Sequence, residues 1–312
     1  KLSFDSVIRY DLPALANTAR KAVLDMALGG LTGAGRLDAL MNTAPLRAFL
    51  GAHMDFSGIT DAVKRGQLYA LAITATGYHS GKSYTFVQGA PELPLWNKSR
   101  RVALPAQITL EHVCASAAIP LVFPPVALTV NGGTAYFGDG ALRLVTPLSP
   151  AIRLGATRLL AIGVRCANAA DDLLREELTA SPASAPEHMQ RPPLSQIIGV
   201  FMNAIFLDHL DADLDHLKRM NDLISAYPPR KLGKPTHKIS EPMRIVRPLS
   251  ISPSEDIAII AKTLAHRMPR TIRYVMDGLG TPDAKSADLT SFLLVDSAFT
   301  RELIQLGKGT AH

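Results

Sequence analysis

The chain has 312 residues, enough for one large α/β domain or two average domains. The formal net charge is +6, and the chain has no run of five or more basic residues, so the charge pattern does not indicate nucleic acid as a partner. A hydrophobic content of 47% excludes a disordered chain, and no apolar stretch reaches the ~18 residues of a membrane span. Cys114 and Cys166 cannot form a disulfide framework, so we expect a cytoplasmic protein, at most peripheral to a membrane.

The first part of the chain has the periodicity of helices. Apolar residues recur every three to four positions from Leu12 to Leu31 and end at a glycine-rich stretch, which predicts a helix and then a loop. The segment NTAPLRAFLGAHMDF predicts a short helix with Asn42 or Thr43 as its N-cap and Pro45 in its first turn.

The middle of the chain has the periodicity of a β-sheet. LYALAITAT (68–76) predicts a strand covered on both faces, with SYTFV as its hairpin partner. After a helix over 110–118, VALTV and TAYFGDG predict two strands joined by a tight turn at Asn131–Gly133. A helix over 147–154 and a buried strand over 158–164 follow. This alternation is typical of a parallel α/β sheet.

The last part of the chain is mainly helical. Residues 166–193 are rich in Ala, Ser, Pro and acidic side chains and predict a solvent-exposed, flexible loop. Leucines and methionines at helical spacing predict a long amphipathic helix over 195–226. MRIVRPLSI predicts a further strand, and we expect helices over 254–276 and 298–306.

Two patterns resemble ligand-binding motifs but lack required residues. GYHSGKS has one residue too few between Gly77 and Gly81 for a phosphate-binding loop, so we interpret it as a hairpin turn, with nucleotide binding as a weak alternative. Asp211, Asp213 and Asp215 lack the glycine of a calcium loop and predict a solvated helix face. The histidines show no zinc spacing, so we expect no metal.

Asp139 is the candidate acidic site residue. It stands between Gly138 and Gly140 at the end of a predicted strand. Small neighbours leave its carboxylate reachable and let the backbone turn sharply. Strand ends in α/β sheets are common positions for functional sites. From the residues alone, a turn aspartate and a functional acid are both open interpretations.

Two longer segments, CASAAIPLVFPPV and YFGDGALRLVTPLSPAIRLGATRLLAIGV, resemble the patatin-like phospholipase family in order and spacing. NTAPLRAFL and LAITATGYHSGKSYTF add to a resemblance that covers about residues 40–165. From Ser195 onward the chain is similar to the C-terminal extension of a bacterial branch of that family. The resemblance implies a three-layer α/β fold with a mainly parallel sheet flanked by helices, plus a helical C-terminal extension.

The resemblance also implies a serine acyl hydrolase, a lipase- or phospholipase-type esterase with a Ser–Asp dyad and no cofactor. In this family the serine stands in a G-x-S-x-G elbow and a glycine-rich loop forms the oxyanion hole. Asp139 in GDGA takes the position of the general base, with Gly138 and Gly140 as its motif neighbours. No serine in the chain has the elbow pattern, so the nucleophile and the oxyanion loop are expected ahead of Lys1.

The implied organisation has three parts: an α/β core over 1–165 that lacks its first strands, a flexible loop over 166–193, and a helical extension over 194–312 packed on the core. We expect the missing strands between LAITAT and LLAIGV, with Asp139 facing a cleft. The expected partners are a lipid or acyl-ester substrate, a membrane surface in transient contact, and the missing N-terminal segment or a second copy of the chain. The alternative function is a catalytically silent module of the same fold that binds lipid or a protein.

Overall fold

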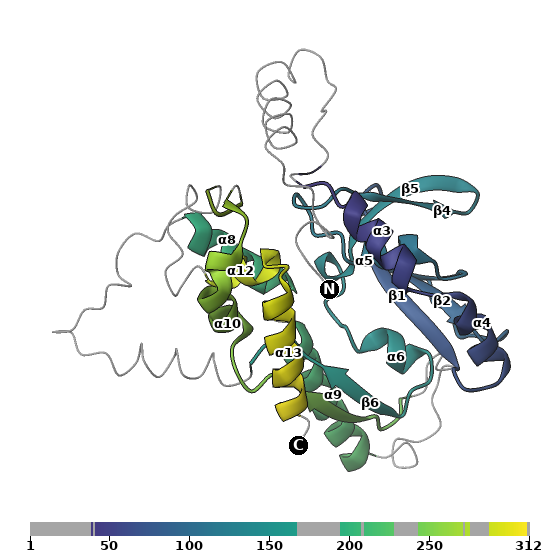
Figure 1. Ribbon diagram of the computed structural model, residues 1–312. Helices are drawn as coiled ribbons and strands as arrows, with labels where there is room; N and C mark the ends of the chain where they lie inside the picture. The colour runs from purple at the N-terminus through teal and green to yellow at the C-terminus, as the bar shows by residue number, and fades with distance from the viewer. Residues whose placement is uncertain are drawn as a thin grey trace.

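The computed structural model describes residues 39, 41–166, 194–206, 209–227, 243–270, 272–274 and 287–310. Within them, a five-stranded sheet and a two-stranded sheet pack against helices (Figure 1). The helix expected over 12–31 lies outside the described residues, as does the loop expected over 166–193 apart from its first residue.

The five-stranded sheet has the order β3-β2-β1-β5-β4. Its strands are β1 (Ala70–Gly77), β2 (Lys82–Gly89), β3 (Arg101–Pro105), β4 (Val126–Val130) and β5 (Gly133–Asp139). β1 pairs antiparallel with β2 and β5, β5 pairs antiparallel with β4, and only β2 and β3 run parallel. The mixed α/β class is confirmed, but the expectation of a mainly parallel sheet is wrong here. Short turns join β1 to β2 and β4 to β5, and a tight turn can connect only antiparallel strands.

Both of these turns follow from local sequence. In the connection between β1 and β2, Gly81 has a φ of +62° and its N–H donates to the carbonyl oxygen of Gly77 at 2.9 Å. Between β4 and β5, Asn131 and Gly132 have φ values of +52° and +79°, a left-handed conformation that these residue types tolerate best. The predictions of a hairpin turn at GYHSGK and of a tight turn at Asn131–Gly133 are therefore confirmed.

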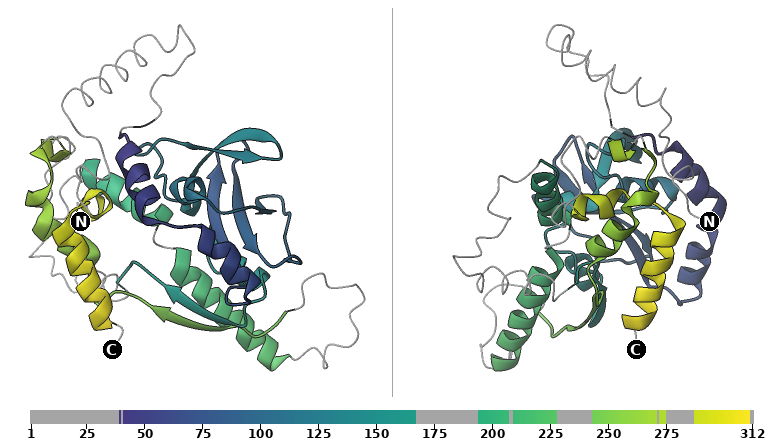
Figure 2. Two further views of the ribbon diagram at one scale, coloured as in Figure 1. Left: turned by 45° about the vertical axis from the view of Figure 1, so that its right-hand side comes forward. Right: turned by 60° about the vertical axis from the view of Figure 1, so that its left-hand side comes forward.

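Helices pack on the five-stranded sheet, as predicted (Figure 2). They are α3 (Ala44–His53), α4 (Ser57–Lys64), α5 (Leu110–Ser116) and α6 (Ser149–Arg153). Thr43 takes the N-cap position of α3 without a side-chain cap hydrogen bond, and Asn42 Oδ1 instead accepts the N–H of Ala44, the first residue of the helix, at 2.9 Å. One face of the sheet and α5 share a core cluster that includes Ala75, Phe86, Ala115 and Phe137. On the opposite face, Ala72 packs against the cluster of Trp96 and Leu154, the residue that follows α6.

The two-stranded sheet is formed by β6 (Arg158–Ile162) and β7 (Arg247–Ile251), which run parallel. One face packs on α9 (His209–Ala226) through a cluster that includes Leu159, Ala161, Leu214 and Leu217. On the other face, Leu160 and Ile162 are 59% and 73% exposed. The prediction of a strand near 158–164 is confirmed, but its burial on both faces is wrong. An apolar run indicates that a strand can be buried, but it does not show which of its faces are covered. Among the described residues, α9 covers one face of β6 and the other face is exposed.

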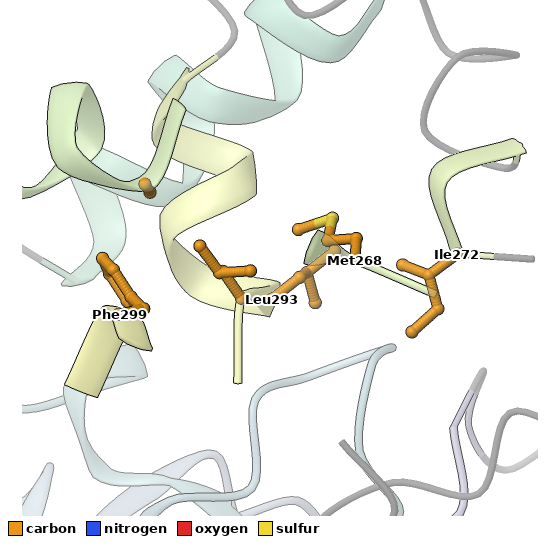
Figure 3. Packing of buried hydrophobic residues seen from close by; sticks show 6 residues of the cluster. Met268, Ile272, Leu293 and Phe299 are labelled. Atoms are coloured by element: carbon orange, nitrogen blue, oxygen red, sulfur yellow. The ribbon is translucent and has the colours of Figure 1, made fainter. Parts of the chain in front are cut away.

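The remaining helices form a separate core cluster (Figure 3). They are α8 (Leu194–Phe206), α10 (Ile257–Leu264), α12 (Ala287–Leu293) and α13 (Ser297–Thr310), with a short 3₁₀ turn, η5 (Ala265–Arg267), after α10. Their cluster contains Ala261, Met268, Ile272, Leu293, Leu294 and Phe299. The single helix expected over 195–226 is two helices, α8 and α9. The helix expected over 254–276 is shorter, because α10 ends at Leu264 and is followed by η5 and Pro269. No helix in the described part of the chain is long and apolar enough to cross a membrane.

Asp213 of α9 corrects the expectation of a solvated acidic helix face. Asp211 and Asp215 are exposed, but Asp213 is buried. Its Oδ2 accepts the backbone N–H of Leu148, just ahead of α6, at 2.9 Å. Burial raises the pKa of the Asp213 carboxyl, and the hydrogen bond from Leu148 and the charge of Arg101 act in the opposite direction. Asp213 therefore ties α9 to the start of α6.

We predict that Asp213→Ala lowers the free energy of unfolding by about 1–3 kcal/mol, because the N–H of Leu148 loses its acceptor. Asp213→Asn should be at least as stable as the parent, since the amide oxygen still accepts that N–H and no charge is buried. Chemical denaturation measures both variants, with Asp211→Ala on the same helix as the exposed control. Equal loss in the Asp213→Asn and Asp213→Ala proteins would contradict the hydrogen-bond explanation.

Candidate active site

Asp139 is the last residue of β5 and caps the following 3₁₀ turn, η1 (Gly140–Leu142). One carboxylate oxygen, Oδ1, accepts the backbone N–H of Ala141 at 2.8 Å. The backbone N–H of Asp139 itself donates to the carbonyl oxygen of Ala118 at 2.9 Å. The ASAAIP segment, which begins in the last turn of α5, thus holds the GDG segment in place. The two motifs that carried the family resemblance are directly hydrogen-bonded to each other.

The two glycines beside Asp139 allow close approach of neighbouring chain. A Cβ atom on Gly140 would overlap with the carbonyl oxygen of Thr74 in β1, and one on Gly138 would overlap with the ring and hydroxyl of Tyr78. Neither glycine is among the residues with positive φ. We expected the glycines to allow a sharp turn of the backbone, and this reason is wrong. Their lack of side chains instead makes room for β1 and for Tyr78.

Tyr78 is a site neighbour that the sequence reasoning missed. It follows β1 directly, and its N–H donates to the carbonyl oxygen of Tyr136 at 3.0 Å, which extends the β1–β5 pairing by one residue. Its ring covers Gly138, next to Asp139. Burial raises the pKa of the Tyr78 phenol, and the charge of Asp139 raises it further. One feature of the sequence indicated this position. Tyr78 is the first residue of the hairpin turn after β1, and the end of β1 lies beside the end of β5.

Burial changes the proton affinity of the Asp139 carboxyl. Partial burial raises the pKa of its carboxyl above the ordinary value of 3.8, and the hydrogen bond from Ala141 counteracts this only in part. The carboxyl consequently has a higher proton affinity than an exposed aspartate. A general base whose pKa lies closer to the working pH accepts a proton more readily in a transition state.

Asp139 lies in the wall of a cavity of about 1360 Å³, which we call the Asp139 cavity. β1, the end of α5, η1, α6, residues 155–158 and 162–165, and the start of α9 contribute the rest of the wall. Typical ligand pockets have volumes of about 300–1,000 Å³. The Asp139 cavity is therefore larger than a pocket for one small ligand.

The serines that lack the elbow pattern do not pair with Asp139. Ser57 donates its hydroxyl to Asp55 at 2.9 Å near the start of α4, and Ser80 accepts the N–H of Lys82 in the β1–β2 turn. Ser116 lines the Asp139 cavity. Among the described residues, no hydrogen bond joins a serine hydroxyl to the Asp139 carboxylate. The same residues hold no cluster of histidine, cysteine, aspartate or glutamate suited to a metal ion.

Comparisons with known proteins give one match. Residues 13–152 match the family model described as patatin-like phospholipase. This range contains the NTAPLRAFL, ASAAIP and GDG segments. A search of curated proteins and a search of solved structures each returned no match.

We predict that Asp139→Asn is more stable than the parent chain at neutral pH. Because the native state raises the pKa of Asp139, ionisation of this carboxyl costs stability as pH rises from the ordinary value of 3.8 through the folded-state pKa. The asparagine keeps the acceptor for Ala141 and carries no charge. The difference in melting temperature between variant and parent should grow over this pH range and then level off. Asp61→Asn, at an exposed position of α4, is the control, and an equal trend there would refute the burial argument.

Proposed function

Since residues 13–152 match the family model described as patatin-like phospholipase, we propose that this chain belongs to that family and is an acyl ester hydrolase that cleaves lipid esters with a Ser–Asp dyad. Asp139 is the general base of this dyad. The observation that carries the proposal is the position of Asp139. A partly buried carboxylate with a raised pKa lies in the wall of a large cavity, held there by the ASAAIP segment.

The geometry of Asp139 suits proton transfer to and from a serine. Ala141 occupies Oδ1, and Oδ2 has no hydrogen-bond partner in the described part of the chain, so Oδ2 is the oxygen available to a hydroxyl. In the proposed reaction Oδ2 takes the serine proton while the serine oxygen attacks the ester carbonyl. The same proton then passes to the leaving alcohol, and water releases the acyl group from the serine with Asp139 again as base.

The nucleophile belongs, in this proposal, to a segment of the protein outside the described residues. A serine hydroxyl needs both a base and fixed N–H donors for the oxyanion, and each contributes roughly 10²-fold or more to the rate. Asp139 alone supplies only the first. The alternative function, a catalytically silent module that binds lipid or protein, follows if no serine reaches the cavity.

Labelling with a serine-directed fluorophosphonate tests the dyad. We expect no labelling of the 312-residue chain and labelling of a longer product that includes the residues encoded ahead of Lys1. In that longer product, Asp139→Asn should lower ester hydrolysis by roughly 10²- to 10⁴-fold, and Asp61→Asn should leave it unchanged. Labelling of the short chain at Ser116 would overturn the assignment of the nucleophile. A longer product without labelling or hydrolysis would favour the silent module.

We also propose that the protein contacts a lipid surface through the outer face of α8. Ile197, Val200 and Phe201 follow one another at helical spacing and are 52%, 61% and 60% exposed, whereas Met202 on the inner face is buried. α8 packs against η1, the turn that follows Asp139, so the helix that carries this apolar face lies beside the candidate site. An amphipathic surface of this kind can enter the boundary between lipid headgroups and acyl chains. The net charge of +6 favours anionic lipid.

Co-sedimentation with vesicles that contain anionic lipid tests this contact. Phe201→Glu should lower the bound fraction several-fold, because a charge enters the apolar face. Leu223→Glu, which changes an exposed leucine on α9, should bind like the parent. Equal binding by both variants would refute a role for α8.

A further inference from the structure

Leu121 has a strained backbone conformation on the loop between α5 and β4. Its φ is +67°, which lies in the left-handed region. In this region the Cβ atom of an L-residue comes too close to a backbone carbonyl oxygen, so glycine and asparagine are the residue types that tolerate it best. All other described residues with positive φ are glycines or Asn131. A leucine in this conformation makes the folded chain less stable.

The side chain of Leu121 does not compensate for this strain by packing in a core. It is 79% exposed, whereas its neighbours Val122 and Phe123 are only partly exposed. A single exposed leucine is common on protein surfaces. Leu121 is disfavoured twice, however, since its backbone is strained and its aliphatic side chain contacts water. Strained backbone of this kind is found most often where a residue contacts a ligand or partner, which indicates that Leu121 contacts a molecule outside the chain.

Hydrogen bonds hold the loop in its conformation. The N–H of Phe123 donates to the carbonyl oxygen of Ile119 at 2.8 Å, which closes a turn with Leu121 at its centre. The N–H of Met41 donates to the carbonyl oxygen of Val122 at 3.0 Å. Prolines directly before Leu121 and after Phe123 further restrict the backbone. These constraints keep the leucine side chain directed outward.

The loop of Leu121 adjoins both the candidate site and α8. Three residues before Leu121, the carbonyl oxygen of Ala118 accepts the N–H of Asp139. On the other side, Val122 and Ile198 of α8 pack against the same core cluster. Leu121 therefore lies on a loop that connects Asp139 with the helix for which we propose a contact to lipid.

The chemistry of the loop favours lipid over protein as the partner. Residues 114–130 include no charged side chain, so the loop offers one outward aliphatic group and no ion pair. A stable contact between proteins buries about 1,200–2,000 Å² of matching surface. A lipid surface accepts a single apolar side chain without such a match. The net charge of +6 attracts the chain to anionic lipid in particular.

We infer that Leu121 is a lipid-contact residue whose side chain enters the acyl layer of an anionic lipid surface beside the candidate site. The strained turn holds the side chain in the orientation that this contact requires. Leu121 thus lowers the stability of the chain and raises its affinity for lipid. The choice of lipid as the partner rests on the proposed function, whereas the strain and exposure of Leu121 are features of the loop itself.

Leu121→Asn tests the inference, because it should change stability and binding in opposite directions. In the 312-residue chain the melting temperature should rise by a few degrees, since asparagine tolerates the left-handed φ. Partition to anionic vesicles should fall roughly tenfold, since no leucine enters the acyl layer. Leu121→Phe stays strained and apolar, so it should bind like the parent without a gain in stability.

Leu223→Asn is the matched control, because Leu223 of α9 is exposed but lies within a regular helix. It should neither raise the melting temperature nor weaken binding. Equal binding by the parent and the Leu121→Asn protein, or no binding by the parent, would overturn the inference. A lower melting temperature of the Leu121→Asn protein would contradict the strain argument.

Tryptophan fluorescence tests whether the side chain enters the lipid. The chain has one tryptophan, Trp96, which is buried and should not respond to vesicles. In the Leu121→Trp protein, vesicles should shift an emission component to shorter wavelength, and lipids with brominated acyl chains should quench it. In the Leu223→Trp protein neither change should occur. Equal quenching in both proteins, or in neither, would refute a specific contact at Leu121.

The remaining outcomes identify the partner. A parent dimer in sedimentation that the Leu121→Asn change converts to a monomer would assign the contact to a second copy and refute lipid. Weaker binding by the Phe201→Glu protein alone would refute the role of Leu121 and leave that of α8. Neither measurement involves hydrolysis, so a failure of the Ser–Asp dyad would appear only in the fluorophosphonate experiment.

Discussion

The pairing of β1 is the constraint on which the rest of the site depends. β1 is bonded to β2 along its whole length, which leaves only its other edge for further partners. β5 takes the last three residues of that edge, Ala75–Gly77, and stops at Asp139 because the chain turns into η1. The Asp139 carboxylate thus lies where the pairing between β1 and β5 ends. Gly140 makes this stop possible, since no larger residue fits against Thr74.

The polar residues of β1 show how tightly this region is packed. Thr74 shares a hydrogen bond of 3.2 Å with Thr85 across the β1–β2 pair, and both side chains are buried. The hydroxyl of Thr76 is buried without a hydrogen-bond partner among the described residues. Leaving such a group unsatisfied costs about 1–3 kcal/mol. An unsatisfied group with a cost of this size lies one residue from Ala75, the register partner of Asp139.

Local signals in the sequence predicted much of the fold. Some elements depend only on residues adjacent in the chain, so the local sequence pattern is enough to predict them. These are the β1–β2 hairpin, the turn at Asn131–Gly133 and the start of the helix after Asn42. Asp139 was singled out in the same way, by its glycines and strand end. Its assignment as a base came from the family resemblance.

Features that depend on distant segments were not predictable. The partner of β6 was not predicted, because β6 pairs with β7, whose residues come much later in the chain. The burial of Asp213 depends on Leu148, and its acidic neighbours gave it the pattern of an exposed helix face. Tyr78 acquires its position through a sheet register that a linear pattern does not show. β3 is short, ends in a proline and follows charged residues, so its composition resembles a loop.

The bond between Asp213 and Leu148 has a consequence for the thermodynamics of filling the cavity. It fixes α9, and with it the β6–β7 sheet, to the segment that leads into α6. Pro147 and Pro150, with restricted backbone angles, lie in the cavity wall within that segment. The receiving walls are therefore preorganised. A molecule that binds in the cavity therefore meets walls that lose little entropy on binding, which is the condition under which a preformed site binds most tightly.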